Sequence, residues 1–129
     1  MRPMSVALTA AALVSGLAGA ARAEQLQGDS LLGAISGKRV FLATPLGGEF
    51  PLNYRANGVV DGSGEAVGLG RFMQPTDSGR WWVDGAKLCQ KWRSWYNGKQ
   101  FCFSITSAGP GKITWARDDG LTGTARIEP

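Results

Sequence analysis

Cys89 and Cys102 are the residues of this 129-residue chain whose chemistry can be assigned most directly. Two thiols can form a disulfide, hold a metal ion or work as a redox pair. A redox pair favours C-x-x-C spacing. A metal site usually adds a second cysteine pair or histidines, and the chain contains no histidine. We therefore predict one structural disulfide, which would contribute about 3 kcal/mol to stability, and we expect neither a metal nor a cofactor.

The chain offers little for acid-base or nucleophilic catalysis. The absence of histidine removes the commonest general base, and no Ser or Thr lies in a nucleophile-elbow pattern. Asp118 and Asp119 are adjacent carboxylates, but they precede Gly120 and are typical of a turn. Asp61 and Glu65 could offer oxygens to Ca²⁺, yet they lack the dense spacing of a calcium-binding loop. We therefore do not expect an enzyme.

Tryptophan is unusually frequent, and four of the five tryptophans lie between Trp81 and Trp95. Because Trp81 and Trp82 are adjacent, one of them must face away from the core if they lie in a strand. An exposed aromatic surface would suit a protein partner, a carbohydrate or a lipid headgroup region. The competing interpretation is that large aromatic rings fill the core of a small barrel. The residues that we select as a partner-binding surface are Trp82, Trp95 and Tyr96, with Lys91 and Arg93 as its polar rim.

The N-terminal segment predicts where the chain works. Arg2 supplies a positive charge, residues 6–21 are largely apolar, and residues 21–23 (Ala-Arg-Ala) match a small-x-small cleavage site. The apolar stretch is too weakly hydrophobic for a membrane anchor. We expect residues 1–23 to be a signal peptide and residues 24–129 to be a single β-rich domain without a transmembrane span. Such a protein would be periplasmic or secreted, in a compartment where paired thiols become disulfides.

Charge argues against one class of partner. Fourteen Lys and Arg oppose 10 Asp and Glu, for a net charge of +4, and Arg2 and Arg22 belong to the expected signal peptide. The remaining basic residues are scattered, and the nearest approach to a cluster is Lys87, Lys91 and Arg93. A mildly basic strand face fits this pattern better than a nucleic-acid site does. We expect no nucleic acid among the partners.

The elements around these residues are mainly β. From Lys38 onward, turn residues separate short runs of β-branched and aromatic residues, and Asn57-Gly58 is typical of a tight hairpin. We predict an antiparallel meander or small barrel of about seven or eight strands, with one short N-terminal helix and one disulfide. The strands are expected at residues 39–44, 50–55, 59–62, 80–84, 87–93, 100–106, 112–117 and 122–127, with 66–72 as a weak strand or a loop.

The short helix is expected to cover an open end of the sheet. Leu31, Leu32 and Ile35 recur at helical spacing. A cap at residue 29 or 30 and a stop at Gly37 would bound the helix.

Side-chain alternation supports the predicted disulfide. Phe101, Phe103 and Ile105 alternate with Cys102, and Cys89 likewise lies on the less apolar face of its own strand. A two-residue turn at 97–98 would place Cys89 opposite a residue later than Cys102. We therefore expect residues 94–99 to form an irregular connection.

Gly79-Arg80-Trp81 is similar to the G-x-W element of lipocalin-type barrels, with Arg126 as a late-strand partner. That element opens the first strand of those barrels. Too few residues follow Trp81 here to supply eight strands, so we do not expect a ligand calyx of that kind.

A longer pattern resembles a group of small exported alphaproteobacterial domains of unknown function. Its most specific part is the order G-x-W, L-C-x-x-W and a second cysteine, and it covers about half of the chain after the signal peptide. The resemblance implies a periplasmic β-rich domain with a disulfide, and it carries no catalytic residues. The matching residues are Tyr54, Asn57-Gly58, Gly62, Gly79-x-Trp81-x-Val83-x-Gly85, Leu88-Cys89-x-x-Trp92 and Cys102.

We expect a non-enzymatic periplasmic binding or accessory module. It would contact a periplasmic protein or a glycan through the Trp-rich, disulfide-tethered hairpin from Trp81 to Phe103. The alternative is an inhibitor of an exported cell-wall hydrolase that inserts a loop into the catalytic cleft of that enzyme.

Overall fold

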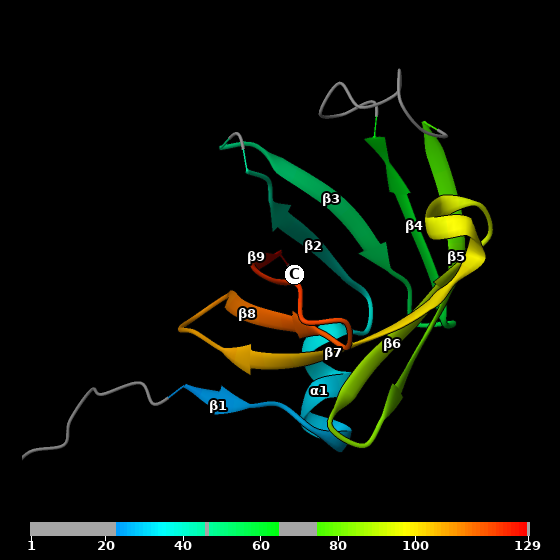
Figure 1. The fold of residues 1–129 in the computed structure, drawn as a ribbon. Helices are drawn as coiled ribbons and strands as arrows, with labels where there is room; N and C mark the ends of the chain where they lie inside the picture. Colours follow the sequence, from blue (N-terminus) through cyan, green and yellow to red (C-terminus); the bar gives the residue numbers. More distant parts are fainter. Residues whose placement is uncertain (1–22, 46, 65–74, 129) are drawn as a thin grey trace, which may run out of the picture.

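The computed structural model describes residues 23–45, 47–64 and 75–128. These residues form an antiparallel barrel with one helix at its lower end (Figure 1). Nearly all of the expected signal peptide, and the weak strand or loop expected at 66–72, lie outside the described residues. The elements in chain order are β1 (Glu24–Gln25), α1 (Gly28–Ile35), β2 (Lys38–Ala43), β3 (Glu49–Tyr54), β4 (Val59–Ser63), β5 (Thr76–Asp84), β6 (Lys87–Trp92), the 3₁₀ turn η2 (Trp95–Gly98), β7 (Gln100–Ser107), β8 (Lys112–Arg117) and β9 (Thr122–Glu128).

Eight of the described strands, β2 to β9, close the barrel. Each pairs antiparallel with the next strand along the chain, and residues 39–42 of β2 pair with residues 125–128 of β9 to close the circle. The short strand β1 pairs with the end of β7. The predicted mainly β meander or small barrel with a helix and a disulfide is therefore confirmed, and β2 to β9 fall on the eight ranges expected to be strands.

The β5 strand is longer than predicted. It begins at Thr76 and not near Arg80. Gly79 weakens the strand pattern in the sequence, but in the structure its lack of a side chain allows β5 to approach β6 closely. A Cβ atom at Gly79 would lie 2.8 Å from the Cα of Trp92.

The disulfide joins directly opposed residues on the outer face of the barrel wall. Cys89 pairs with Cys102 in the β6–β7 register, and their Cα atoms are 4.0 Å apart. The η2 turn lies inside residues 94–99, so the irregular connection and the disulfide are both as predicted.

The α1 helix closes one end of the barrel (Figure 1). Leu31 and Ile35 are fully buried, and the backbone N–H of Gly28 donates to the carbonyl of Gly85 at 2.8 Å. The predicted helix is confirmed, but its N-cap is Gln27. Ser30 instead stabilises the first turn, because its Oγ accepts a hydrogen bond from the Gln27 backbone N–H at 3.2 Å.

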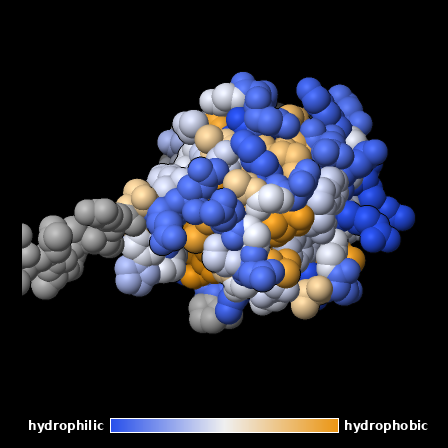
Figure 2. Space-filling view, turned by 90° about the horizontal axis from the view of Figure 1, so that it is seen from below, coloured by the Kyte–Doolittle hydropathy of each residue, from blue (hydrophilic) through white to orange (hydrophobic). Residues whose placement is uncertain are grey.

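Figure 2 views the molecule from below in Figure 1, the side on which α1 lies, and shows small separate apolar areas among polar side chains. Leu32 of this helix is partly exposed. Within the described ranges, no helix is both long and apolar enough to cross a lipid bilayer.

Candidate functional site

The barrel encloses a cavity of about 310 Å³. Its lining extends from Ile35 of α1 to Pro45, Tyr96 and Leu121 in the turns at the opposite end, which we call the mouth. This corrects the expectation that the chain has no calyx. The strand that carries Gly79-Arg80-Trp81 is the fourth strand of the barrel and not the first, because β2, β3 and β4 precede it.

The wall of the cavity is mainly aliphatic and aromatic. Side chains alternate between the inside and the outside along each strand, so the apolar residues of every second position meet inside the barrel. Leu42, Phe50, Leu52, Phe103 and Ile105 all line the cavity. Their dominance makes the cavity a poor place for a hydrated or multiply charged molecule.

The mouth is partly covered by Trp95, which turns into the barrel. The Asp77 carboxylate accepts hydrogen bonds from the backbone N–H groups of Ser94 at 2.9 Å and Trp95 at 2.8 Å. The Trp95 ring packs edge-to-face on Phe50, with 5.6 Å between centroids. A Cβ atom at Gly62 would lie only 3.1 Å from this ring, so the glycine makes room for it.

Tyr96 forms the exposed lip of the mouth. Its backbone has a φ of 56°, in the left-handed region that non-glycine residues seldom adopt. The residue is 51% exposed, and its ring contacts Phe101 edge-to-face with 5.2 Å between centroids. An exposed aromatic residue held in a strained conformation is typical of a functional position.

Arg117 is the one charged residue among the described residues that line the cavity. Its guanidinium lies over the Phe101 ring, 4.3 Å from the centroid, and makes two hydrogen bonds to the Asp119 carboxylate, at 2.8 and 2.7 Å. These hydrogen bonds lower the pKa of Asp119 to about 2. The guanidinium of Arg117 therefore lies at the mouth and is already paired with the carboxylate of Asp119.

The wall also carries four polar side chains deep in the barrel. The Tyr54 hydroxyl donates to Oε1 of Gln90 at 2.6 Å, and burial raises the pKa of Tyr54, so the hydroxyl keeps its proton. The indole N–H groups of Trp92 and Trp115 are buried, and neither donates to any described residue. The two indole N–H groups are therefore enclosed by the packed side chains of the wall.

The residues selected from the sequence as one partner surface lie in different places. Trp95 is buried inside the barrel, whereas Tyr96 lies at the mouth. Trp82 and Lys91 lie on the outer face of β5 and β6, where Trp82 is opposite Cys89. Arg93 lines a groove on the outside of the barrel. Trp95 thus follows the competing interpretation, in which large aromatic rings fill a barrel core.

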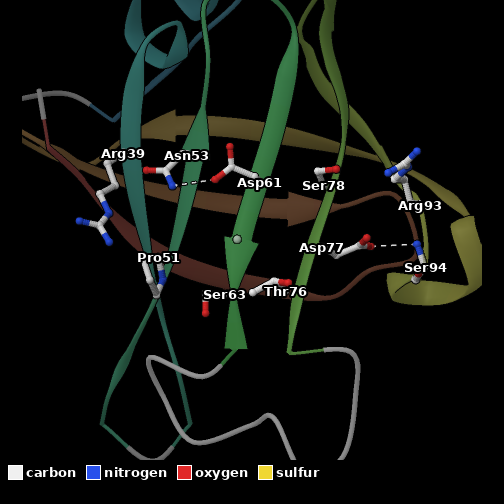
Figure 3. Close-up of a pocket in the computed structure, with 11 residues that line it drawn as sticks. Arg39, Pro51, Asn53, Asp61, Ser63, Thr76, Asp77, Ser78, Arg93 and Ser94 are labelled. Atoms are coloured by element: carbon white, nitrogen blue, oxygen red, sulfur yellow. Dashed lines mark hydrogen bonds between the residues drawn. The ribbon is translucent and has the colours of Figure 1, made fainter.

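That outer groove has a volume of about 640 Å³ and a polar lining (Figure 3). Its carboxylates are already engaged. Asp61 pairs with Arg55 and accepts from the side-chain amide of Asn53 at 2.9 Å, and Asp77 holds the backbone of residues 94–95. In the described part of the chain, no three acidic, Cys or His residues gather as metal ligands. The internal cavity is therefore the better candidate site.

Sequence reasoning did not select Phe103, Trp115 or Arg117 as site residues. The signal was present in alternation, because Trp115 and Arg117 share the parity of the buried Ile113 in the predicted strand 112–117. Gln90 gave a second signal, since it is a polar residue at the parity of the apolar Leu88.

No protein-family model, curated protein or solved structure matches this chain. The resemblance to small exported alphaproteobacterial domains stays a prediction. The disulfide is compatible with an exported protein.

Proposed function

We propose that the protein is a non-enzymatic binding protein that holds a small apolar molecule inside its barrel, in the periplasm or outside the cell. The observation that carries this proposal is the cavity of about 310 Å³, lined almost wholly by uncharged side chains. Ligand pockets commonly have volumes of about 300 to 1,000 Å³, with apolar walls and a few polar groups. Eight-stranded barrels are just wide enough to hold one small ligand.

The rigid packing of the wall and the opening at the mouth support this use of the cavity. A rigid interior preserves space for a ligand only if the surrounding rings cannot collapse into it. Trp115 packs closely on Gly123, where a Cβ atom would lie 2.6 Å from Cε2 of the indole ring. Access is available at the mouth, where Tyr96 and Leu121 are half exposed.

Binding of 1-aminoanthracene, a neutral dye that fluoresces in apolar surroundings, tests the proposal. We expect saturable binding at one site per chain. Leu42→Trp would fill the mouth half of the cavity and abolish dye binding. Phe41→Trp is the matched control, because Phe41 lies on the same strand but faces outward, under Arg126. Equal dye binding by both variants would overturn the proposal.

A second candidate is inhibition of an exported cell-wall hydrolase by the turn at residues 94–99. The exposed, left-handed Tyr96 favours it, because such a residue can enter the cleft of a partner without rearrangement. Titration of a lysozyme acting on purified peptidoglycan tests this function. We expect inhibition that Tyr96→Ala relieves, and unchanged hydrolysis across the titration would exclude this enzyme as the target.

A further inference from the structure

We propose that the mouth of the barrel docks on the surface of a lipid bilayer, with the side chains of Tyr96 and Leu121 inserted among the lipid headgroups. This inference rests on the proposed function, because it names the surface from which the barrel would take up an apolar molecule. The partner of the mouth is then a bilayer and not a second protein.

The mouth is apolar where it meets water. Among the described residues that line the cavity, we call the exposed ones the rim. They come from three separate segments of the chain, and all have apolar or aromatic side chains: Ala43, Pro45, Tyr96 and Leu121. Exposed apolar side chains that gather in one place mark an interaction site. The rim therefore indicates a partner that covers the mouth.

Two residues of the rim are large and adjoin each other. The exposed large hydrophobic residues in the described part of the chain are Tyr96, Leu121 and Leu32, and Leu32 is the one that lies away from the mouth. The guanidinium carbon of Arg117 lies 5.6 Å from the centroid of the Tyr96 ring. The backbone N–H of Arg117 donates to the carbonyl of Leu121 at 2.7 Å. Tyr96 and Leu121 thus lie on either side of one residue and form one surface.

The small size of the rim favours a lipid surface over a protein. A stable protein interface buries about 800 Å² on each partner and takes roughly 20 to 30 residues of each, far more than the rim supplies. A second copy of this chain would meet the same limit. A bilayer needs only apolar side chains that enter its interfacial region. Tyrosine is enriched there, because its ring is apolar and its hydroxyl is polar.

The charges that flank the rim nearly cancel. Within four residues of Tyr96 and Leu121, the chain carries three cations and two carboxylates, which leaves one positive charge: Arg93, Lys99, Arg117, Asp118 and Asp119. Arg117 and Asp119 already form an ion pair. So small a net charge attracts an anionic surface only weakly. We therefore expect the apolar side chains to supply most of the binding, and we expect docking to persist in salt.

Docking would give an apolar molecule a path that avoids water. The apolar lining continues from the rim through the barrel to Ile35 of α1 at the closed end. A molecule that enters directly from the bilayer exchanges one apolar environment for another. A molecule that enters from water must first leave the bilayer, which costs the free energy of hydrating its apolar surface.

Flotation with phosphatidylcholine vesicles tests the proposal on the disulfide-bonded native protein. These vesicles carry no net charge, and the experiment is repeated in about 1 M salt, where the screening length is about 3 Å. Adsorption through the positive charge of the chain is thereby separated from docking. We expect the protein to float with the vesicles under both conditions. With spin-labelled headgroups, the amide signals of Tyr96 and Leu121 should broaden in NMR spectra, and those of α1 should stay sharp.

A double variant removes the apolar side chains of the rim. Tyr96→Asn with Leu121→Ser should weaken vesicle binding about tenfold, because less apolar surface leaves water on docking. Asparagine is chosen because it tolerates the left-handed backbone at this position. Leu32→Ser is the matched control, since Leu32 is 44% exposed at the sealed end, and it should bind vesicles like the native protein. The spectra of the native protein decide the question if the double variant does not fold.

The vesicle and dye experiments fail separately. Dye binding without vesicle binding would overturn this inference and leave the proposed function in place. Equal vesicle binding by the double variant and the native protein, or broadening confined to α1, would also overturn the inference. Vesicle binding that depends on the rim, without dye binding, would support docking and overturn the proposed function. Recovery of a protein by the native chain alone, without vesicle binding, would assign the rim to a protein partner and overturn docking on lipid.

Discussion

The two ends of the barrel are built differently. At the lower end, α1 covers the interior with Leu31 and Ile35, both completely buried. At the mouth, Trp95 alone turns inward from residues 94–99, while Tyr96 and Leu121 stay half exposed. One end is sealed by helix packing. The other is covered by a turn whose backbone N–H groups at Ser94 and Trp95 donate to the Asp77 carboxylate. The difference indicates that stability is concentrated at the lower end and that the cavity opens at the mouth.

The largest effect is expected from the sealed end. Ile35→Ala removes a completely buried side chain and should lower the free energy of unfolding by about 2 to 5 kcal/mol. Urea unfolding measures this change. Leu32→Ala on the same helix is the control, because Leu32 is 44% exposed and its loss should cost well under that amount. Equal losses in the two variants would contradict the assignment of stability to this end.

The disulfide should affect stability without affecting the cavity. The double variant Cys89→Ala and Cys102→Ala should lower the free energy of unfolding by about 3 kcal/mol, because the bridge joins residues that are 13 positions apart in the chain. Both cysteines lie on the outer face, so dye binding by the folded variant should be unchanged. Loss of dye binding at a temperature where circular dichroism shows that the variant is folded would mean that the disulfide also affects the cavity.

A smaller effect is expected at the mouth. Asp77→Ala removes the acceptor of two backbone N–H groups and should lower the free energy of unfolding by about 1 kcal/mol. Dissociation of the dye should become several-fold faster, because Trp95 is no longer held over the cavity. Stopped-flow displacement measures the rate, and Asp84→Ala, at the sealed end of the same strand, is the control. An unchanged dissociation rate would show that the turn does not gate access.

The smallest effect is expected from pH. The pKa of Asp119 is lowered to about 2, so the contribution of its ion pair is complete above the ordinary pKa of an aspartate and is lost as the pH falls through about 2. The chain also lacks histidine. Dye affinity should therefore be constant between about pH 4 and pH 8. A midpoint within that range would indicate a titrating group that the cavity does not show.

Much of the fold could be predicted because its determinants are local. Turn residues such as Asn57-Gly58 bounded the strands, and alternation placed Cys89 and Cys102 on the same outer face. These features act over a few residues of sequence, and both were confirmed.

The rest depended on contacts between distant residues. Closure of the barrel joins β2 to β9, and no local sequence pattern predicts this pairing. The direction of Trp95 could not be predicted either, because it lies in a 3₁₀ turn, where strand alternation does not apply. It was therefore assigned to the surface, although Gly62 leaves space for its ring inside the barrel.

The β2–β9 pairing has a consequence for how the chain must fold. Every other pairing in the closed barrel joins strands that are consecutive in the sequence, whereas this one joins the first barrel strand to the last. Its loop-closure entropy is the largest of all, and topologies with such distant contacts fold more slowly. Until β9 docks, β2 and β8 both have an open hydrogen-bonding edge that can recruit other chains. We therefore expect aggregation during refolding to depend on how fast β9 pairs with β2.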